Sequence, residues 1–223
     1  MKEKRVNIAI DGPSGVGKTI MATMLAKKLN YKFLSSGSFY RIIAYNALVN
    51  NLNLKNEEEV NSAWAFDDIE ILDDDSLIFK GIDVTKKIRE DIVAKSASQI
   101  AKFPSVRIKV NQFIQIYAKK NKGIIVDGRD ATYRILPDAE VKFFMSASPE
   151  IRAKRRMLQD EQMGIHSNYS DVYESIKKRD YEDTNRPIDP LKVSEGSIEV
   201  DTSNMSIEEN FEVLYQEILK RIN

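Results

Sequence analysis

The fold of this chain is decided by the stretch Gly12-Pro13-Ser14-Gly15-Val16-Gly17-Lys18-Thr19. It matches G-x-x-x-x-G-K-[ST], a loop that turns its backbone N–H groups inward around the β-phosphate of a nucleotide. The N-terminus of the following helix adds partial positive charge, and Lys18 adds a full one. Thr19 offers a hydroxyl oxygen to Mg²⁺, a hard cation that prefers oxygen ligands. We therefore predict a nucleoside triphosphate site that runs from Gly12 to Ile20.

The sequence around this loop favours a parallel sheet covered by helices on both faces. A short apolar run, Val6 to Ile10, precedes the loop, and apolar residues at helical spacing follow it. Four later segments also have the character of buried strands next to helical stretches: 31–35, 123–127, 141–147 and 197–201. The pattern predicts an α/β fold of the P-loop NTPase type with five parallel strands.

Two segments interrupt this alternation. Ile69–Leu72, Leu77–Phe79 and Ile82–Val84, with the acidic turn Asp73-Asp74-Asp75, predict a small antiparallel meander. A mostly helical stretch follows, interrupted near Phe103-Pro104. We predict a single domain with a core of about residues 1–34, 111–149 and 188–223, and with excursions at about 35–110 and 150–187.

Two helix starts are marked by the sequence. Ser148-Pro149-Glu150 places a proline at the first helical position, where its missing N–H costs nothing. The stretch Ser206 to Glu209 has the pattern of a capping box, and an apolar face follows it.

The composition sets limits on partners and compartment. The 34 basic and 34 acidic residues among 223 cancel, so the chain has no global attraction to nucleic acid or to an anionic membrane. The chain has no Cys, which excludes disulfides and thiolate–metal sites and suits a reducing cytosol. The apolar run at the N-terminus is too short for a signal-peptide core or a membrane span. We expect a soluble, cytoplasmic protein.

Charged residues gather where a phosphate site would need them. Arg152, Arg155 and Arg156 share one face of the helix that starts at Ser148, and Arg179, Asp183 and Arg186 follow at spacings of four and three. Such a row can be a solvated face with ion pairs of about 0.2–0.5 kcal/mol each. In a protein that holds a triphosphate, it favours stabilisation of the charge that spreads over a moving phosphoryl group.

A second polar group, Asp127-Gly128-Arg129-Asp130, directly follows a predicted strand. Ligands of open parallel sheets bind outside the carboxyl ends of the strands, so this tetrapeptide should face the same crevice as the glycine-rich loop. Asp127 can orient Mg²⁺ through water, and Arg129 can hold a phosphate. His166 is the only histidine; it lies in a polar segment, and we expect it to be exposed.

Together these motifs make the chain resemble the bacterial cytidylate kinases. The resemblance extends collinearly over nearly the whole chain and rests on Asp11–Lys18, Ser36–Arg41, Ala97–Gln99, Phe103–Arg107, Asp127–Asp130, the Arg179–Arg186 region and the tail 201–209. It implies a P-loop core, an inserted nucleoside monophosphate (NMP)-binding domain at 35–110 and a helical lid at 150–187.

The resemblance also implies a reaction, ATP + CMP ⇌ ADP + CDP, with dCMP accepted and Mg²⁺ as cofactor. We expect the protein to be a monomer. By motif position, Ser98, Arg107 and Asp130 would read the cytosine, whose exocyclic amine can donate to a carboxylate. Arg41, Arg129 and Arg186 would hold the acceptor's phosphate, and Arg179 with Asp183 would reach the sugar. Ser36 would also contact the acceptor. The residues implied for catalysis are Lys18, Arg129, Arg152, Arg156, Arg179 and Arg186.

The chain departs from the family pattern at three places. Ser35 stands where the family usually has Asp, Thr19-Ile20 replaces a small residue followed by a hydroxyl residue, and Ala131-Thr132-Tyr133-Arg134 replaces a stretch that contains a Gly-Thr pair.

Other functions remain open at this point. The chain can be a P-loop kinase for UMP or for the hydroxyl of a metabolite, or a nucleotide-binding module without catalysis, which the lid arginines disfavour. A GTP switch is disfavoured because Asn121-Lys122-Gly123-Ile124 lacks the final carboxylate of Asn-Lys-x-Asp.

Overall fold

A parallel sheet of five strands organises the computed structural model, which describes residues 4–72, 76–162 and 164–222. The order of the strands is β2-β6-β1-β7-β8. Their bounds are Ile8–Asp11 (β1), Lys32–Ser35 (β2), Ile124–Gly128 (β6), Val141–Ser146 (β7) and Ile198–Asp201 (β8). All five strands predicted from the sequence are confirmed. The chain divides into two compact units, one made of the segments up to Tyr31 and from Lys122 onward, the other of Lys32–Asn121.

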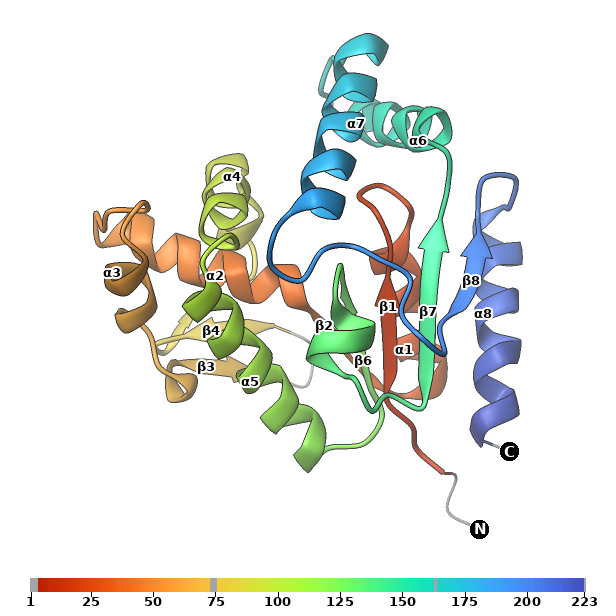
Figure 1. Cartoon of the computed structure of the whole chain (residues 1–223), viewed down its shortest axis with the longest axis horizontal. Coiled ribbons are helices and arrows are strands. Elements are labelled where there is room, and N and C mark those ends of the chain that lie inside the picture. The colour runs from red at the N-terminus through yellow and green to blue at the C-terminus, as the bar shows by residue number, and fades with distance from the viewer. Residues whose placement is uncertain (1–3, 73–75, 163, 223) are drawn as a thin grey trace. The chain divides into compact units, whose positions relative to one another are not determined.

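The first unit is built around β1. Ile8 of β1 lies opposite Ile125 of β6 and Val141 of β7, and every residue of β1 is buried. Strands of a parallel sheet are covered on both faces, which explains why β1 reads as a continuous apolar run. Figure 1 shows β1, β7 and β8 pointing in the same direction, so their carboxyl ends share one edge of the sheet.

The glycine-rich loop joins β1 to α1 (Lys18–Leu29). Gly12 has a φ of 149°, and a Cβ at this position would lie 2.2 Å from the carbonyl oxygen of Met145 in β7. Only glycine allows this close approach of two backbones. Helix α1 packs on β6 and on the last helix, α8 (Ile207–Ile222).

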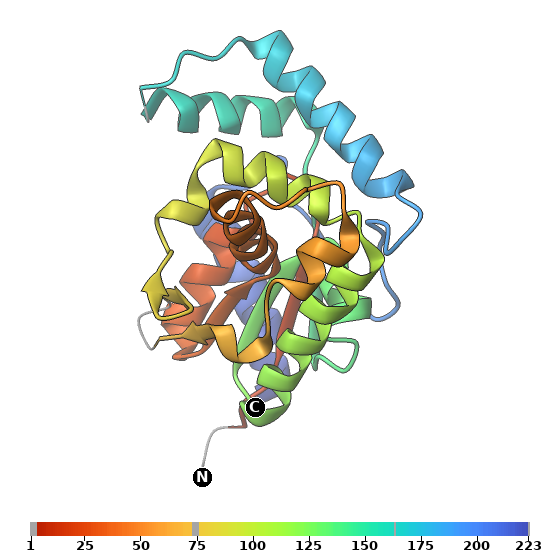
Figure 2. The same cartoon turned by 90° about the vertical axis from the view of Figure 1, so that its left-hand side faces the viewer.

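Two long helices, α6 (Pro149–Gln162) and α7 (Tyr169–Asn185), form a hairpin after β7. Figure 2 shows the pair crossing one another, in teal and cyan. Proline occupies the first position of α6, as predicted. Helix α7 ends at Asn185, and the extended backbone of Arg186 leads into Pro187.

The capping box of α8 is also confirmed. The Glu209 carboxylate accepts from the backbone N–H of Ser206 at 2.8 Å, and the Ser206 hydroxyl accepts from the N–H of Glu209 at 3.1 Å. These two bonds satisfy donors that the helix itself leaves without partners.

Besides β2, the described residues of the second unit form helices and a small antiparallel sheet. The helices are α2 (Ser36–Val49), α3 (Glu57–Ser62), α4 (Asp91–Ile100) and α5 (Pro104–Lys120), with 3₁₀ turns at Phe66–Asp68 and Lys87–Arg89. The sheet is the predicted antiparallel meander of β3 (Ile69–Ile71), β4 (Leu77–Phe79) and β5 (Ile82–Asp83). The predicted acidic turn Asp73-Asp74-Asp75 lies outside the described residues.

Aromatic side chains form the centre of this second unit. The Phe39 and Phe113 rings lie 5.1 Å apart between centroids, and Phe66 contacts both Phe113 and Trp64. Each ring contributes a large apolar area, so the cluster holds α2, α5 and the turn before β3 together.

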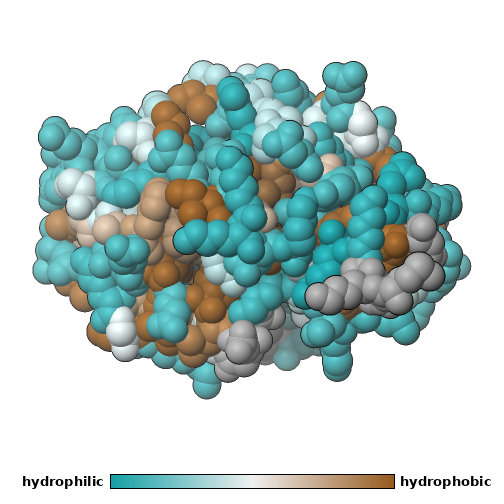
Figure 3. Space-filling model, turned by 90° about the horizontal axis from the view of Figure 1, so that it is seen from below, coloured by the Kyte–Doolittle hydropathy of each residue, from teal (hydrophilic) through white to brown (hydrophobic). Residues whose placement is uncertain are grey.

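The surface is mainly polar, as expected from 30% charged residues. Figure 3 shows one face, on which apolar side chains are interspersed among hydrophilic ones. Within residues 4–72, 76–162 and 164–222, no helix is both long and apolar enough to span a bilayer.

Candidate active site

The glycine-rich loop of the first unit folds around its own lysine. Lys18 is 6% exposed, and its Nζ donates to the carbonyl oxygens of Gly12 at 2.7 Å and Pro13 at 2.8 Å. The ammonium group therefore lies under the loop, where the phosphates of a nucleotide are expected.

The electrostatic environment of Lys18 disfavours its charge. Burial lowers the pKa of Lys18 well below its ordinary value, and the Arg129 guanidinium lowers this pKa further, while Asp127 opposes the shift. A buried cation next to a second cation is costly without a matching anion. The arrangement is therefore suited to an anionic ligand with more than one negative charge.

Thr19 and Asp127 form a pair of oxygen donors beside the loop. The Thr19 hydroxyl donates to Oδ2 of Asp127 at 2.8 Å. Asp127 lies near the carboxyl end of β6 and is buried. Hydroxyl and carboxylate oxygens are ligands that Mg²⁺ prefers, usually together with phosphate oxygens and waters. The two side chains predicted to serve the metal thus lie in direct contact.

Two ion pairs connect the turn after β6 to the end of the helical hairpin. Nε of Arg129 donates to Asp183 of α7 at 2.6 Å, and Nη2 of Arg186 donates to Asp130 at 3.1 Å. All four residues were predicted as substrate-binding. In the structure they form two ion pairs, each between a guanidinium and a carboxylate.

Arg152 of α6 makes several hydrogen bonds. It is 3% exposed and makes a bidentate pair with Asp180 of α7, at 2.9 and 2.5 Å. It also donates to the carbonyl oxygens of Ser14 at 3.1 Å and Ala147 at 2.9 Å. This guanidinium, carried by α6, thus contacts the glycine-rich loop, the segment between β7 and α6, and α7.

The other arginines of the hairpin point to different partners. Arg155 donates to the Thr202 hydroxyl and carbonyl, after β8. Arg156 pairs with Asp160 one turn further along α6 and is about half exposed. Arg179 is exposed on α7. The shared helix face therefore does not direct Arg152, Arg155 and Arg156 to one point.

The sequence analysis assigned no role to Asp11. In the structure, its carboxylate binds the turn that directly follows Asp130. Its carboxylate is fully buried and accepts from the backbone N–H of Ala131 at 2.8 Å and of Thr132 at 2.9 Å, and from the Thr132 hydroxyl at 2.6 Å. Burial raises the pKa of Asp11, and the Thr132 hydrogen bonds oppose that rise. The sequence feature that could have revealed the role of Asp11 is its place at the end of a predicted buried strand. Asp11 fixes the π-helical turn Ala131–Ile135, directly after Asp130.

Four predicted acceptor residues belong to the second unit. Ser36 is buried at the start of α2, and Arg41 lies on the same helix. The Ser98 hydroxyl donates to the Ala94 carbonyl within α4. Arg107 of α5 is buried; it donates to the Ala101 carbonyl at 3.3 Å and lies over the Tyr40 ring.

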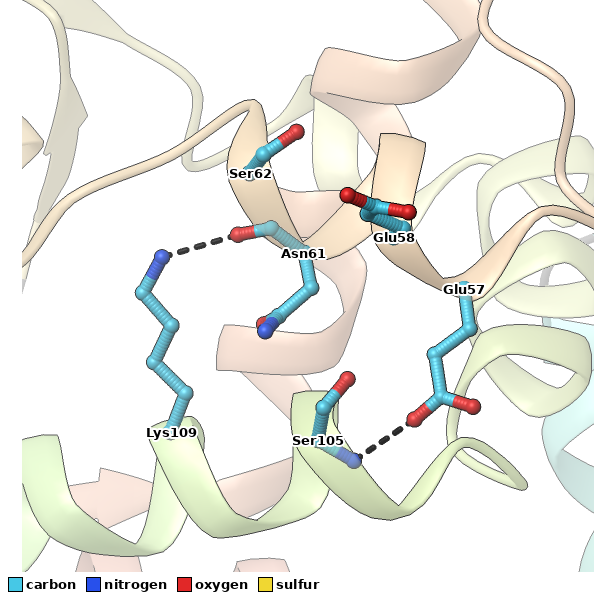
Figure 4. Close-up of a pocket in the computed structure, with 6 residues that line it drawn as sticks. All are labelled: Glu57, Glu58, Asn61, Ser62, Ser105 and Lys109. Carbon is cyan, nitrogen blue, oxygen red and sulfur yellow. Dashed lines mark hydrogen bonds between the residues drawn. The ribbon is translucent and has the colours of Figure 1, made fainter.

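A hollow of about 570 Å³ also lies in the second unit, between α3 and α5 (Figure 4). Its lining contains none of the predicted residues. The Lys109 ammonium donates to the Asn61 carbonyl at 2.8 Å, and the Glu57 carboxylate accepts from the Ser105 N–H at 2.7 Å. The Glu57 bond satisfies a free donor in the first turn of α5. These contacts hold the two helices together, so we assign the hollow a structural role.

His166 is exposed between α6 and α7, as predicted. Over the described part of the chain, no three His, Asp or Glu side chains gather as a ready metal site.

This chain is similar to known proteins over nearly its whole length. The family model for cytidylate kinase matches residues 8–220. A cytidylate kinase of Mycoplasmopsis synoviae is 45% identical over 207 residues, which cover 93% of this chain and 95% of the relative. A cytidylate kinase of Mycoplasmopsis agalactiae is 40% identical over 205 residues, covering 92% and 93%. Among solved structures, the shikimate kinase of Bacteroides thetaiotaomicron matches with a TM-score of 0.50 and 10% identity over 97% of this chain and 99% of the other, a likeness of fold alone.

Proposed function

This chain belongs to the cytidylate kinase family, and we propose that it transfers the γ-phosphoryl group of ATP to CMP, giving ADP and CDP, with dCMP as a second acceptor. The single observation that carries the proposal is the placement of Lys18. It is a buried ammonium under a glycine-rich loop, beside the Thr19–Asp127 pair and near the Arg129 guanidinium. Such a cationic site suits a polyphosphate and the charge that develops when a phosphoryl group moves.

We assign the donor to the loop Gly12–Ile20. Its backbone N–H groups and the N-terminus of α1 would surround the β-phosphate, as expected for this motif. Lys18 would exchange its two carbonyl acceptors for phosphate oxygens. This exchange is favourable because the anion compensates a charge that burial disfavours.

Mg²⁺ fits the oxygen pair of Thr19 and Asp127, 2.8 Å apart. We propose that Thr19 ligates the ion and that Asp127 holds it through water. When bound, the ion would neutralise charge on the phosphates during transfer. A site with few protein ligands is typical for Mg²⁺ bound with a nucleotide.

We assign the acceptor's phosphate to Arg41, Arg129 and Arg186, and its sugar to Arg179 and Asp183. The ion pairs of Arg129 and Arg186 support this assignment. In the structure each guanidinium is paired with a carboxylate. We propose that the phosphate of the acceptor replaces these carboxylates when it binds.

Base selection would rest on Ser98, Arg107 and Asp130, with Ser36 as a further acceptor contact. An ionised Asp130 accepts from the exocyclic amine of cytosine and repels the carbonyl that uracil presents there. No protein base is required, because the attacking phosphate oxygen of CMP is largely ionised near neutral pH. Catalysis would come from alignment and from neutralisation of charge, with Arg152 and Arg156 contributed by the lid.

We further propose that residues 35–110 form the acceptor-binding part and that 150–187 form a lid which excludes water during transfer. We propose that the active form is a monomer and that it works in the cytoplasm, whose reducing conditions suit a chain without Cys.

A coupled assay of ADP formation tests the proposal. Purified protein is given ATP and Mg²⁺ with CMP, dCMP, UMP, AMP or dTMP, and Lys18→Ala serves as the inactive control. We expect turnover with CMP and dCMP and at least tenfold lower kcat/KM with the other acceptors. Equal turnover of UMP, or turnover by Lys18→Ala, would contradict it.

A further inference from the structure

The segment 186–191, which leaves α7, is fastened to the turn after β6. Nε of Arg134 pairs with the Asp189 carboxylate, and the Tyr133 hydroxyl donates to the Pro190 carbonyl. Both segments belong to the same compact unit. Tyr133 and Arg134 lie in the stretch where this chain departs from the pattern of its family.

The Asp189 side chain is held tightly although its partner faces solvent. The side chain of Asp189 is 7% exposed, whereas that of Arg134 is 60% exposed. Asp189 also has a φ of 49°, in the left-handed region that residues other than Gly rarely adopt. A buried carboxylate in a disfavoured backbone conformation persists only when its surroundings hold it there. The Arg134 guanidinium is one such restraint.

Asp189 is directly connected to Arg186. Nε of Arg186 donates to the carbonyl oxygen of Asp189 at 2.6 Å, and its Nη2 donates to Asp130 at 3.1 Å. The direction of the Arg186 guanidinium therefore depends on where the Asp189 carbonyl lies. At the other end of the segment, the Leu191 N–H donates to the carbonyl of Asp183 in α7 at 2.8 Å.

We propose that Arg134 and Asp189 are positioning residues: their ion pair fixes segment 186–191 and thereby aims Arg186 at the phosphate of the acceptor nucleotide. The inference rests on the proposed function, because it takes Arg186 to bind the acceptor. Neither Arg134 nor Asp189 contacts substrate in this scheme; both act through the backbone that carries Arg186.

The test compares Arg134→Met, Asp189→Asn and the double variant with the wild type. We expect each single variant to raise the KM for CMP about fivefold to tenfold, with kcat and the KM for ATP changed less than twofold. The double variant should equal the singles, because both remove one interaction. Arg134→Lys should recover part of the loss.

Amide exchange provides a second readout that does not need substrate. The Leu191 amide should exchange at least about tenfold faster in Arg134→Met than in the wild type, because its segment is released. Lys122→Met is the matched control: it removes the cation of another partly exposed ion pair, Lys122–Glu140, before β6 rather than after it. This control should leave both readouts unchanged.

The outcomes separate this inference from the proposed function. If the wild type phosphorylates CMP while Arg134→Met keeps the wild-type KM for CMP, the inference alone is wrong. An equal rise in the KM for ATP also overturns the inference, since loss of the ion pair would then weaken both substrates and not the acceptor alone. If the wild type does not phosphorylate CMP, the proposed function and the inference fall together. Asp189→Asn removes the buried charge together with the ion pair, so it keeps the inference testable if Arg134→Met does not fold.

Discussion

The hydroxyl of Thr19, in the first turn of α1, donates a hydrogen bond of 2.8 Å to the carboxylate of Asp127, 108 residues later in the chain. The bond connects the glycine-rich loop to the end of β6, the neighbour of β1 in the sheet. It brings together the two side chains that we propose to serve Mg²⁺.

We expect Thr19→Val to lower kcat by roughly 10- to 100-fold and to raise the Mg²⁺ concentration needed for half-maximal rate, because a ligand is lost without loss of volume. Steady-state rates over a Mg²⁺ titration measure this. Thr23→Val, one turn further along α1, is the control; its hydroxyl donates only to the Thr19 carbonyl. Similar Mg²⁺ dependence in both variants would refute the assignment.

Replacement of Lys18 should separate activity from stability. Lys18→Met should lose at least about 100-fold in kcat, as for removal of a single charge-stabilising donor, while unfolding stays cooperative.

The stability of Lys18→Met should also depend on pH differently from that of the wild type. The pKa of Lys18 is lowered in the folded state, so the unfolded chain binds the extra proton at pH values between the folded and unfolded pKa. The wild type should therefore gain stability relative to Lys18→Met as pH rises toward 10. Urea unfolding of both proteins at pH 7 and 9.5 measures the difference, and a constant difference would contradict the burial of a charged lysine.

Replacement of Asp130 should change the KM for CMP much more than the KM for ATP. Asp130→Ala removes the proposed acceptor for the cytosine amine, so the KM for CMP should rise roughly tenfold or more, while the KM for ATP changes little. Asp138→Ala, an exposed carboxylate shortly after the π-helical turn, is the control. An equal loss for both nucleotides would mean that Asp130 serves the fold and not the base.

Gly12→Ala should destabilise the protein by more than about 2 kcal/mol, because the new Cβ would meet the Met145 carbonyl in a conformation that alanine disfavours. Gly37→Ala is the matched control. A Cβ there meets only the Ser35 hydroxyl, at 3.8 Å, so the free energy of unfolding should change by about 0.5 kcal/mol or less. Urea unfolding compares them; equal stability of both variants would contradict the close approach of the two backbones.

The sequence predicted the elements better than it predicted the contacts. Strands such as Ile8–Asp11 and Ile124–Gly128 are recognisable because burial on both faces demands continuous apolar runs. The helix start at Pro149 and the capping box at Ser206 follow from local hydrogen-bonding chemistry, which needs no tertiary information.

The partners of the arginines could not be predicted in the same way. Helical spacing placed Arg152 and Arg155 on one face, but Arg152 binds Asp180 and Arg155 binds Thr202. The role of Asp11 was missed because its carboxylate accepts hydrogen bonds from a turn 120 residues away. Long side chains take their direction from distant segments, which a single sequence does not record.

The four hydrogen bonds of Arg152 bear on how the proposed lid would move. Its guanidinium binds Asp180, Ser14 and Ala147, which belong to three separate segments of the chain. A group with several acceptors can release one while the rest retain it, so its charge stays compensated at each stage. If α7 moves, as we propose for a lid, Arg152 would release Asp180 while it keeps its bonds to Ser14 and Ala147, so the start of α6 would stay joined to the glycine-rich loop.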